Sequence, residues 1–106
     1  MTAAAAPPAR LFVINTFTLK PGASQEEFVA LMKATVDKAP AGCLSVQLHS
    51  SVDGRKVLNR SEWSDMAAFE RRFEGGGKEA FGKIMALVES VQQEPFWLDA
   101  DVQVAR

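Results

Sequence analysis

The sequence predicts an α+β domain in which four strands and two helical regions follow the order β-α-β-β-α-β. Three observations support this order. Apolar residues run or alternate as in strands in four stretches, and they recur at helical spacing in others. Glycine, proline and Asp-Gly pairs separate these stretches. With 106 residues, of which 47% are hydrophobic, the chain is long enough for one core.

The first half is expected to form a strand and a helix. Residues 11–19, LFVINTFTL, are apolar on both alternating sets and rich in strand-forming residues, which is typical of a central strand. Ser24 and Glu27 have the spacing of a capping box and predict the start of a helix. The apolar stripe of this helix comprises Phe28, Leu31, Met32, Thr35 and Val36. Residues 39–42, APAG, are expected to end the helix.

A hairpin is predicted from Cys43 to Trp63. Asp53-Gly54 is a strong turn signal, because both residue types tolerate positive φ. If these two residues form the loop, the opposing pairs are Leu48 with Asn59, Val46 with Ser61, and Leu44 with Trp63. Opposite side chains share a face of the sheet. The set expected to face the helices is therefore Asn59, Ser61 and Trp63, and the set expected on the other face is His49, Arg60 and Glu62.

An asparagine among apolar residues under the helices needs partners, because burying an unpaired amide costs about 1–3 kcal/mol. Asn59 is either a satisfied core residue or part of a cavity wall, and the residues alone leave both interpretations open. Trp63 at a strand end is by itself typical of packing. Asn15, in the first strand, is open to the same two interpretations.

The second half is expected to contain a divided helical region and a last strand. Ser64 is a candidate cap for a short helix that carries Met66, Phe69 and Phe73, and residues 75–77, GGG, should break it. A longer helix is predicted from the stripe formed by Phe81, Ile84, Met85, Val88 and Val91. The last strand is predicted from Phe96 to Val104, where apolar and polar residues alternate after Pro95.

This order favours a ferredoxin-like antiparallel sheet with helices on one face and the first and third strands as central neighbours. The other sheet face needs cover, so a homodimer formed through that face is expected. Residues 1–10, MTAAAAPPAR, lack the pattern of a secretory signal and are expected to be a disordered arm before a single domain over 11–106.

Charge and composition narrow the classes of partner. The formal net charge of −1 provides no basic field for nucleic acid or an anionic membrane. The single cysteine, Cys43, excludes an intramolecular disulfide and a cysteine-rich zinc site. No stretch is apolar over the length of a transmembrane helix, so a cytoplasmic protein is expected.

The stretch HSSVDGRKVLNRSEWSDMAAF resembles the second hairpin and following helix of the antibiotic biosynthesis monooxygenase family. Within that family it is most similar to the small cofactor-independent oxygenases that oxidise anthrones in aromatic polyketide tailoring. The matching features are a histidine, an Asp-Gly turn and an Asn-x-x-x-Trp motif, which here are His49, Asp53-Gly54, Asn59 and Trp63. At the level of element order, the similarity extends from Phe12 to Val104.

The resemblance implies a dimeric α+β barrel with a hydrophobic cavity between sheet and helices in each subunit. There an anthrone or quinol would react with O₂ to a quinone without flavin, haem or metal. Asn59 would donate a hydrogen bond to the developing oxyanion, and Trp63 would add a ring wall and an indole N–H. Further binding residues would be Asn15, Phe69, Phe73, Phe81, Lys83 and Met85.

Two residues depart from the pattern of the anthrone oxidases. The chain contains no tyrosine, and Phe69 stands where those enzymes carry one, which removes a candidate member of a proton relay. Lys83 stands where their later helix has an arginine. The charge is kept, but a single ammonium replaces a planar fork of donors.

Two other functions fit the expected fold. Haem-degrading relatives share the tryptophan and an asparagine at the position of Asn15, but they need a histidine ligand where Phe73 stands. The only histidine, His49, is expected on the wrong face of the sheet. A non-catalytic dimeric ligand-binding module would explain the missing tyrosine. The discriminating observation is whether Asn59 and Trp63 border an open cavity of ligand size.

Overall fold

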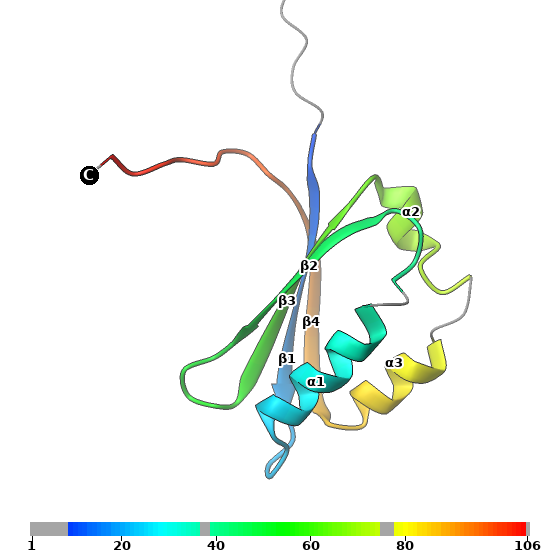
Figure 1. Ribbon diagram of the computed structural model, residues 1–106, viewed down its shortest axis with the longest axis vertical. Helices are drawn as coiled ribbons and strands as arrows, with labels where there is room; N and C mark the ends of the chain where they lie inside the picture. Colours follow the sequence, from blue (N-terminus) through cyan, green and yellow to red (C-terminus); the bar gives the residue numbers. More distant parts are fainter. Residues whose placement is uncertain (1–8, 37–38, 75–77, 106) are drawn as a thin grey trace, which may run out of the picture.

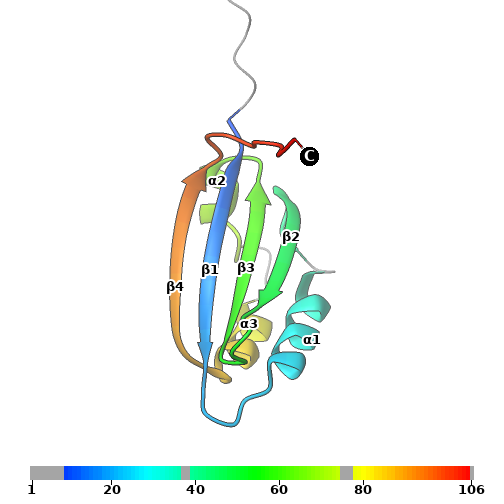
Figure 2. The same ribbon diagram turned by 90° about the vertical axis from the view of Figure 1, so that its left-hand side faces the viewer.

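The computed structural model of the chain describes residues 9–36, 39–74 and 78–105. These residues form the ferredoxin-like α+β fold that the sequence predicts, an antiparallel sheet in the order β2-β3-β1-β4 with helices against one face (Figure 1). The elements are β1 (Leu11–Leu19), α1 (Gln25–Val36), β2 (Cys43–Ser50), β3 (Lys56–Trp63), α2 (Met66–Glu70), α3 (Lys78–Met85) and β4 (Val88–Trp97). None of the described helices lies on the other face, which is called the open face below (Figure 2). Residues 1–8 of the predicted arm and the predicted break at 75–77 lie outside the described residues.

The start of α1 agrees with its predicted cap. The Oγ of Ser24 accepts a hydrogen bond from the backbone N–H of Glu27 (3.2 Å), which satisfies one free donor of the first turn. The helix buries Phe28 and Met32. The ring centroid of Phe28 lies 5.1 Å from that of Phe17 in β1, so α1 is held directly against the central strand.

The β2–β3 hairpin has the predicted pairing through most of its length, with Leu48 opposite Asn59 and Val46 opposite Ser61. Its loop is longer than the two residues expected, because the N–H of Ser51 still donates to the carbonyl of Lys56 (2.9 Å). A loop that is longer by two residues leaves the parity of the pairing unchanged. The predicted side chains therefore face the helices.

The predicted pairing is wrong at the other end of β2. Cys43, and not Leu44, lies opposite Trp63, because a bulge separates Cys43 from Ser45. Leu44 is the extra residue of this bulge and is 61% exposed. A bulge adds one unpartnered residue and then restores the alternation, so an alternating sequence pattern carries no signal for it.

The helical region after β3 is divided, as predicted, but its limits differ. Asp65 caps α2 in place of Ser64, because its Oδ1 accepts a hydrogen bond from the N–H of Ala68 (2.7 Å). The short helix ends at Glu70, so Phe73 lies beyond it. None of the described helices combines the length and hydropathy needed to cross a membrane.

The position of β4 corrects the sequence prediction most. The predicted helical stripe continues through Val88 and Val91, yet both valines belong to β4, which ends at Trp97. Residues 98–104, predicted as strand, form neither helix nor strand. Val88 is buried as the first residue of the strand, so its apolar character fits both structures. Because β4 is an edge strand, it tolerates exposed polar residues and Pro95, which has no N–H.

The open face carries Phe12 beneath two arginines. The guanidinium carbons of Arg60 and Arg10 lie 4.1 and 5.3 Å from the centroid of its ring. Arg10 also pairs with Glu62 (2.9 Å), the residue that the sequence analysis placed beside Arg60. Residues 98–105 leave the body of the domain on the side of the open face (Figures 1 and 2).

Two apolar clusters pack between the sheet and the helices. One joins the sheet to α1 and α3 and contains Phe17, Leu19, Phe28, Met32, Val57, Ile84 and Val88. The other joins β1 and β3 to α2 and contains Leu11, Val13, Trp63, Ala68 and Phe69. Along the two central strands, Asn15 and Asn59 fall between these clusters.

Gly42, before β2, should not tolerate a side chain. Its φ is +94°, and an added Cβ would collide with the Cβ of Ala68 in α2. We expect Gly42→Ala to lower the free energy of unfolding by about 2–4 kcal/mol, measured by urea denaturation. Gly22 is the matched control, because its φ is +85° and its surroundings are open. Gly22→Ala should lower the free energy of unfolding by about 1–2 kcal/mol. Equal losses in the two variants would contradict the close approach of α2 to Gly42.

Candidate functional site

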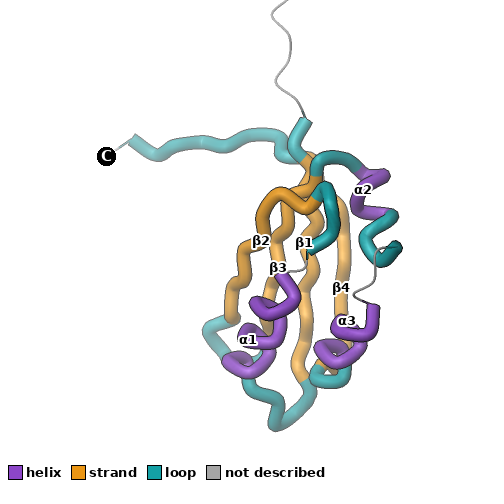
Figure 3. The backbone as a smooth tube through the Cα atoms, turned by 45° about the vertical axis from the view of Figure 1, so that its right-hand side comes forward, coloured by secondary structure: helices purple, strands orange, loops and turns teal. Residues whose placement is uncertain are grey.

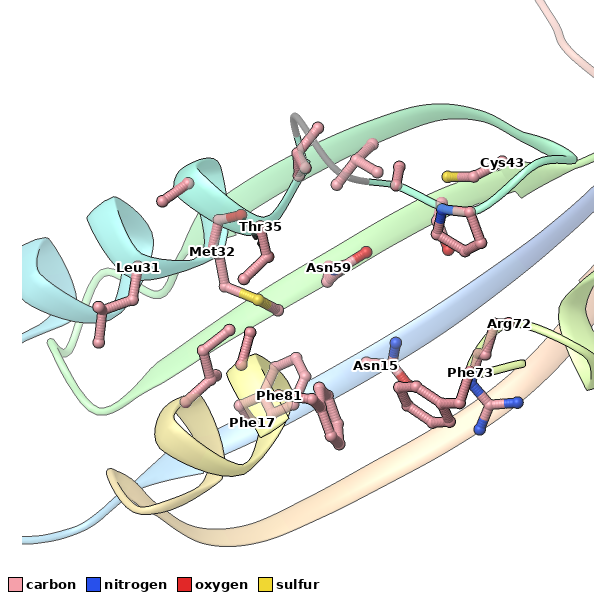
Figure 4. A pocket seen from close by; sticks show the side chains of 18 of the residues that line it. Asn15, Phe17, Leu31, Met32, Thr35, Cys43, Asn59, Arg72, Phe73 and Phe81 are labelled. Carbon is pink, nitrogen blue, oxygen red and sulfur yellow. Dashed lines mark hydrogen bonds between the residues drawn. The ribbon is translucent and has the colours of Figure 1, made fainter. Parts of the chain in front are cut away.

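A cavity of about 630 Å³ lies between the inner face of the sheet and the helices (Figure 4). Members of both apolar clusters border it, and the helices stand over the strands that form its floor (Figure 3). Its volume is in the range of small-molecule sites, about 300–1,000 Å³. The expected cavity beside Asn59 and Trp63 is therefore present.

Two asparagines face each other on the floor of the cavity. Asn15 in β1 and Asn59 in β3 are directly opposite in the antiparallel ladder, and both border the cavity. The Oδ1 atom of each is buried and has no hydrogen-bond partner among the described residues. A buried acceptor without a donor costs about 1–3 kcal/mol. The described contacts therefore give no support to the interpretation that these two asparagines are core residues with satisfied hydrogen bonds.

Gln93 extends this pair to a row of three amides across neighbouring strands. It lies opposite Asn15 on the other side of β1 and also borders the cavity, although it is exposed at the sheet edge. The sequence analysis missed Gln93 because it assigned no strand before Pro95. Once β4 is correctly placed, its pairing with β1 identifies the residue.

Trp63 contributes a ring to the cavity wall, but its indole N–H is already engaged. The N–H donates to the Oγ of Ser61 (2.8 Å), and this hydroxyl in turn donates to the carbonyl of Val13 (3.3 Å). The ring packs edge-to-face against Phe69, with centroids 5.3 Å apart. The expected role of the indole as a second donor to a ligand therefore does not follow from the structure.

The remaining predicted residues fall into two groups. Phe69, Phe73, Phe81 and Lys83 border the cavity, and the rings of Phe73 and Phe81 lie 5.5 Å apart. Lys83 is exposed. Met85 is not among the bordering residues and packs against the cluster around Phe17. The aromatic wall is thus built from α2, α3 and the segment between them.

Arg72 borders the cavity and was not singled out from the sequence. Its guanidinium carbon lies 4.1 Å from the ring centroid of Phe69 and 4.8 Å from that of Phe73, and one N–H donates to the carbonyl of Phe69 (3.0 Å). Burial lowers the pKa of this guanidinium. The adjacency of an arginine to Phe73, three residues after Phe69, is the sequence signal that could have identified it.

The thiol and the imidazole of the chain differ in their position relative to the cavity. Cys43 borders it, and burial raises the pKa of its thiol, which favours the less nucleophilic protonated form. His49 lies opposite Leu58 on the open face. No described residue at the cavity is a histidine, so the bordering side chains do not offer the imidazole ligand that the sequence analysis gave as a requirement of the haem-degrading relatives.

The sequence profile described as antibiotic biosynthesis monooxygenase matches residues 10–85, and the chain belongs to this family. No curated protein matches the sequence. Among solved structures, PA3566 from Pseudomonas aeruginosa is 29% identical, with coverage of 87% of this chain and 96% of that one and a TM-score of 0.68. A monooxygenase from the gene ActVA-Orf6 of Streptomyces coelicolor, in complex with nanaomycin D, is 20% identical, with coverage of 92% and 94% and a TM-score of 0.75.

The same fold also carries a different reaction class. Hydroxynitrile lyase from Passiflora edulis is 15% identical, with coverage of 92% of this chain and 100% of that one and a TM-score of 0.71. Fold and family therefore place the chain among monooxygenase-like proteins, while the reaction has to be argued from the side chains of the cavity.

Replacing either asparagine by leucine should stabilise the protein. Asn15→Leu and Asn59→Leu each remove a buried acceptor without a partner, so we expect the free energy of unfolding to rise by about 1 kcal/mol or more in urea denaturation. Thr35 is the matched control, because it borders the same cavity but donates to the carbonyl of Met32 (2.7 Å). Thr35→Val should lower the stability by about 0.5–1.5 kcal/mol. Destabilisation by both leucines would show that the asparagine amides are satisfied.

Proposed function

We propose that the cavity binds an anthrone- or quinol-type phenolic polycycle and allows it to react with O₂ to a quinone without a cofactor. The observation that carries this proposal is the pair of buried, unpartnered Oδ1 atoms of Asn15 and Asn59 in an aromatic-walled cavity of about 630 Å³. Cavities that stay empty in proteins are apolar, whereas amides line this floor, which suits a ligand with polar groups. Membership of a monooxygenase family supports the reaction class.

The substrate supplies the electrons in this reaction. Loss of a proton gives an electron-rich carbanion or phenolate, which transfers one electron to O₂. The two radicals combine to a peroxide anion, which takes up a proton to give a hydroperoxide, and loss of water leaves the quinone. One oxygen atom of O₂ enters the product and the other leaves as water, so the atoms balance without a further reductant.

The amides can form hydrogen bonds with such a substrate both before and after it loses its proton. A phenolic O–H can donate to an unpartnered Oδ1, and an Nδ2 can donate to the oxygen on which charge develops after deprotonation. One preorganised donor of this kind contributes roughly 10²–10³ in rate. Trp63 and Phe69 provide flat apolar walls against which a polycycle can pack. The roles assigned are donor for Asn59, binding for Asn15 and ring wall for Trp63.

A ligand-binding module without turnover is the second candidate. Among the described residues at the cavity there is no carboxylate, imidazole or phenol, and Phe69 stands in place of the tyrosine of the anthrone oxidases. The first proton therefore has no side-chain base close to the amides in the described part of the chain. This observation favours binding without catalysis, and the experiment below separates the two functions.

We also propose that the chain forms a homodimer through the open face. The apolar residues of this face are Phe12, Ile14, Leu58 and Phe96, as the strand pairings show. Residues 98–105 extend on the same side, with Val102 and Val104 at 78% and 74% exposure. A second copy would cover the face and these valines, and an isologous contact is the commonest arrangement of soluble oligomers.

Oxygen uptake with anthrone tests the catalytic function. Purified protein in chelator-treated buffer should consume O₂ faster than the spontaneous reaction and release anthraquinone. Asn59→Ala should lower kcat by about 10²–10³, because it removes the donor to the oxyanion. Lys33→Ala is the control, since Lys33 is exposed on α1 and does not border the cavity. Anthrone binding without faster uptake would support the binding module, and unchanged kcat in Asn59→Ala would remove its assigned role.

Light scattering after size exclusion tests the dimer. The expected mass is twice the 11.5 kDa of the chain. Leu58→Asp places a charge on the open face and should shift the protein to the monomer, while Lys33→Glu should leave the mass unchanged. A monomeric wild-type protein at tens of micromolar would contradict the proposal.

A further inference from the structure

Arg72 is the one strongly basic group on the cavity wall that is partly buried in the described part of the chain. It lies just after α2, with its guanidinium stacked against the rings of Phe69 and Phe73. The hydrogen bond to the carbonyl of Phe69 (3.0 Å) fixes its position further. Figure 4 shows Arg72 beside Phe73, on a different wall from Asn59. Its place is therefore set by packing and not by an acidic partner.

The charge of Arg72 is not compensated by the described neighbours. Its pKa is lowered by burial, and no acidic group counteracts this effect. Among the described residues that border the cavity, Arg72 and Lys83 are cationic and none is a carboxylate. The charged side chains described at the cavity are thus both positive, although the whole chain has a net charge of −1. A partly buried cation without a counter-ion favours an anionic ligand.

The geometry of the guanidinium indicates which class of anionic ligand Arg72 can bind. Arginine has five N–H donors in a planar fork, and the described contacts use one nitrogen, Nη1, for the carbonyl of Phe69. The remaining donors suit a carboxylate, which arginine binds through two parallel hydrogen bonds. Contact with two rings restricts the position of the guanidinium, while its other N–H donors have no partner among the described contacts. An aromatic acid would therefore find both its ring wall and its counter-ion in one place.

We propose that Arg72 binds a carboxylate carried by the substrate, so that the cavity selects aromatic acids over neutral polycycles. This inference rests on the proposed function of the cavity and names its substrate class. With the carboxylate at Arg72, the phenolic end of the molecule is directed to the amides on the sheet. Arg72 acts in binding and orientation, and the reacting oxygen is left to Asn15 and Asn59.

Binding of two matched ligands tests the proposal by titration calorimetry at pH 7.5. Anthraquinone-2-carboxylate and anthraquinone-2-carboxamide share ring system and shape and differ in charge. The wild-type protein should bind the carboxylate about tenfold or more tightly, because a charged hydrogen-bonded pair contributes more than a neutral one. Arg72→Gln should weaken carboxylate binding about tenfold to a hundredfold and change carboxamide binding less than about threefold.

Arg71→Gln is the matched control, because Arg71 is the exposed neighbour of Arg72 and does not border the cavity. It should weaken carboxylate binding less than about threefold, since an exposed guanidinium outside the cavity is well solvated. Arg72→Lys keeps the charge but loses the fork, and its affinity for the carboxylate should lie between those of the wild type and Arg72→Gln. Equal unfolding midpoints of all variants would show that the fold is retained.

The outcomes separate this inference from the proposed function. Equal affinity of the wild-type protein for both ligands would overturn the role of Arg72 while leaving the cavity as an aromatic site. Parallel losses for both ligands in Arg72→Gln would show a structural role and would also overturn it. Failure of the wild-type protein to bind either ligand would count against the carboxylate and the aromatic site together.

Discussion

The arrangement of this domain depends on one constraint, the placing of an asparagine at the same level in both central strands. Antiparallel pairing sets Asn15 opposite Asn59, and apolar side chains cannot pack over two amides without leaving polar groups unsatisfied. The core is therefore divided, and the helices are held from its two ends, by the contact of Phe17 with Phe28 and by that of Trp63 with Phe69. The floor of the cavity is a consequence of the strand sequences, and residues of α2, α3 and the segment after α2 supply its aromatic wall.

The parts of this site that depend on local pairing could be predicted from the sequence. The turn signal at Asp53-Gly54 set the parity of the hairpin, so the inward direction of Asn59 and Trp63 held even though the loop is longer than expected. Gln93 and Arg72 could not be found in this way. Gln93 lies on an edge strand whose polar residues conceal its alternation. Arg72 lies in the turn just after α2, where neither helical nor strand periodicity applies.

The chemistry of the cavity follows from the separation of its polar groups. The amides come from the sheet and the guanidinium from the segment after α2, where Phe73 lies beside it. A ligand held at both polar regions would have its orientation restricted before any reaction occurs, which is the condition for efficient use of a preorganised donor. The lack of a described side-chain base beside the amides means that the acidity of the substrate itself would influence the rate.

The two edges of the sheet also affect how the protein meets other copies of itself. Pro95 removes a backbone donor from β4 at one edge, and the bulge at Leu44 interrupts the regular hydrogen-bonding pattern of β2 at the other. Proline and bulges on edge strands are two of the devices by which proteins discourage the growth of a continuous sheet from chain to chain. Strand pairing between copies is therefore disfavoured at both edges of the sheet. Association through the open face can then end at a closed dimer.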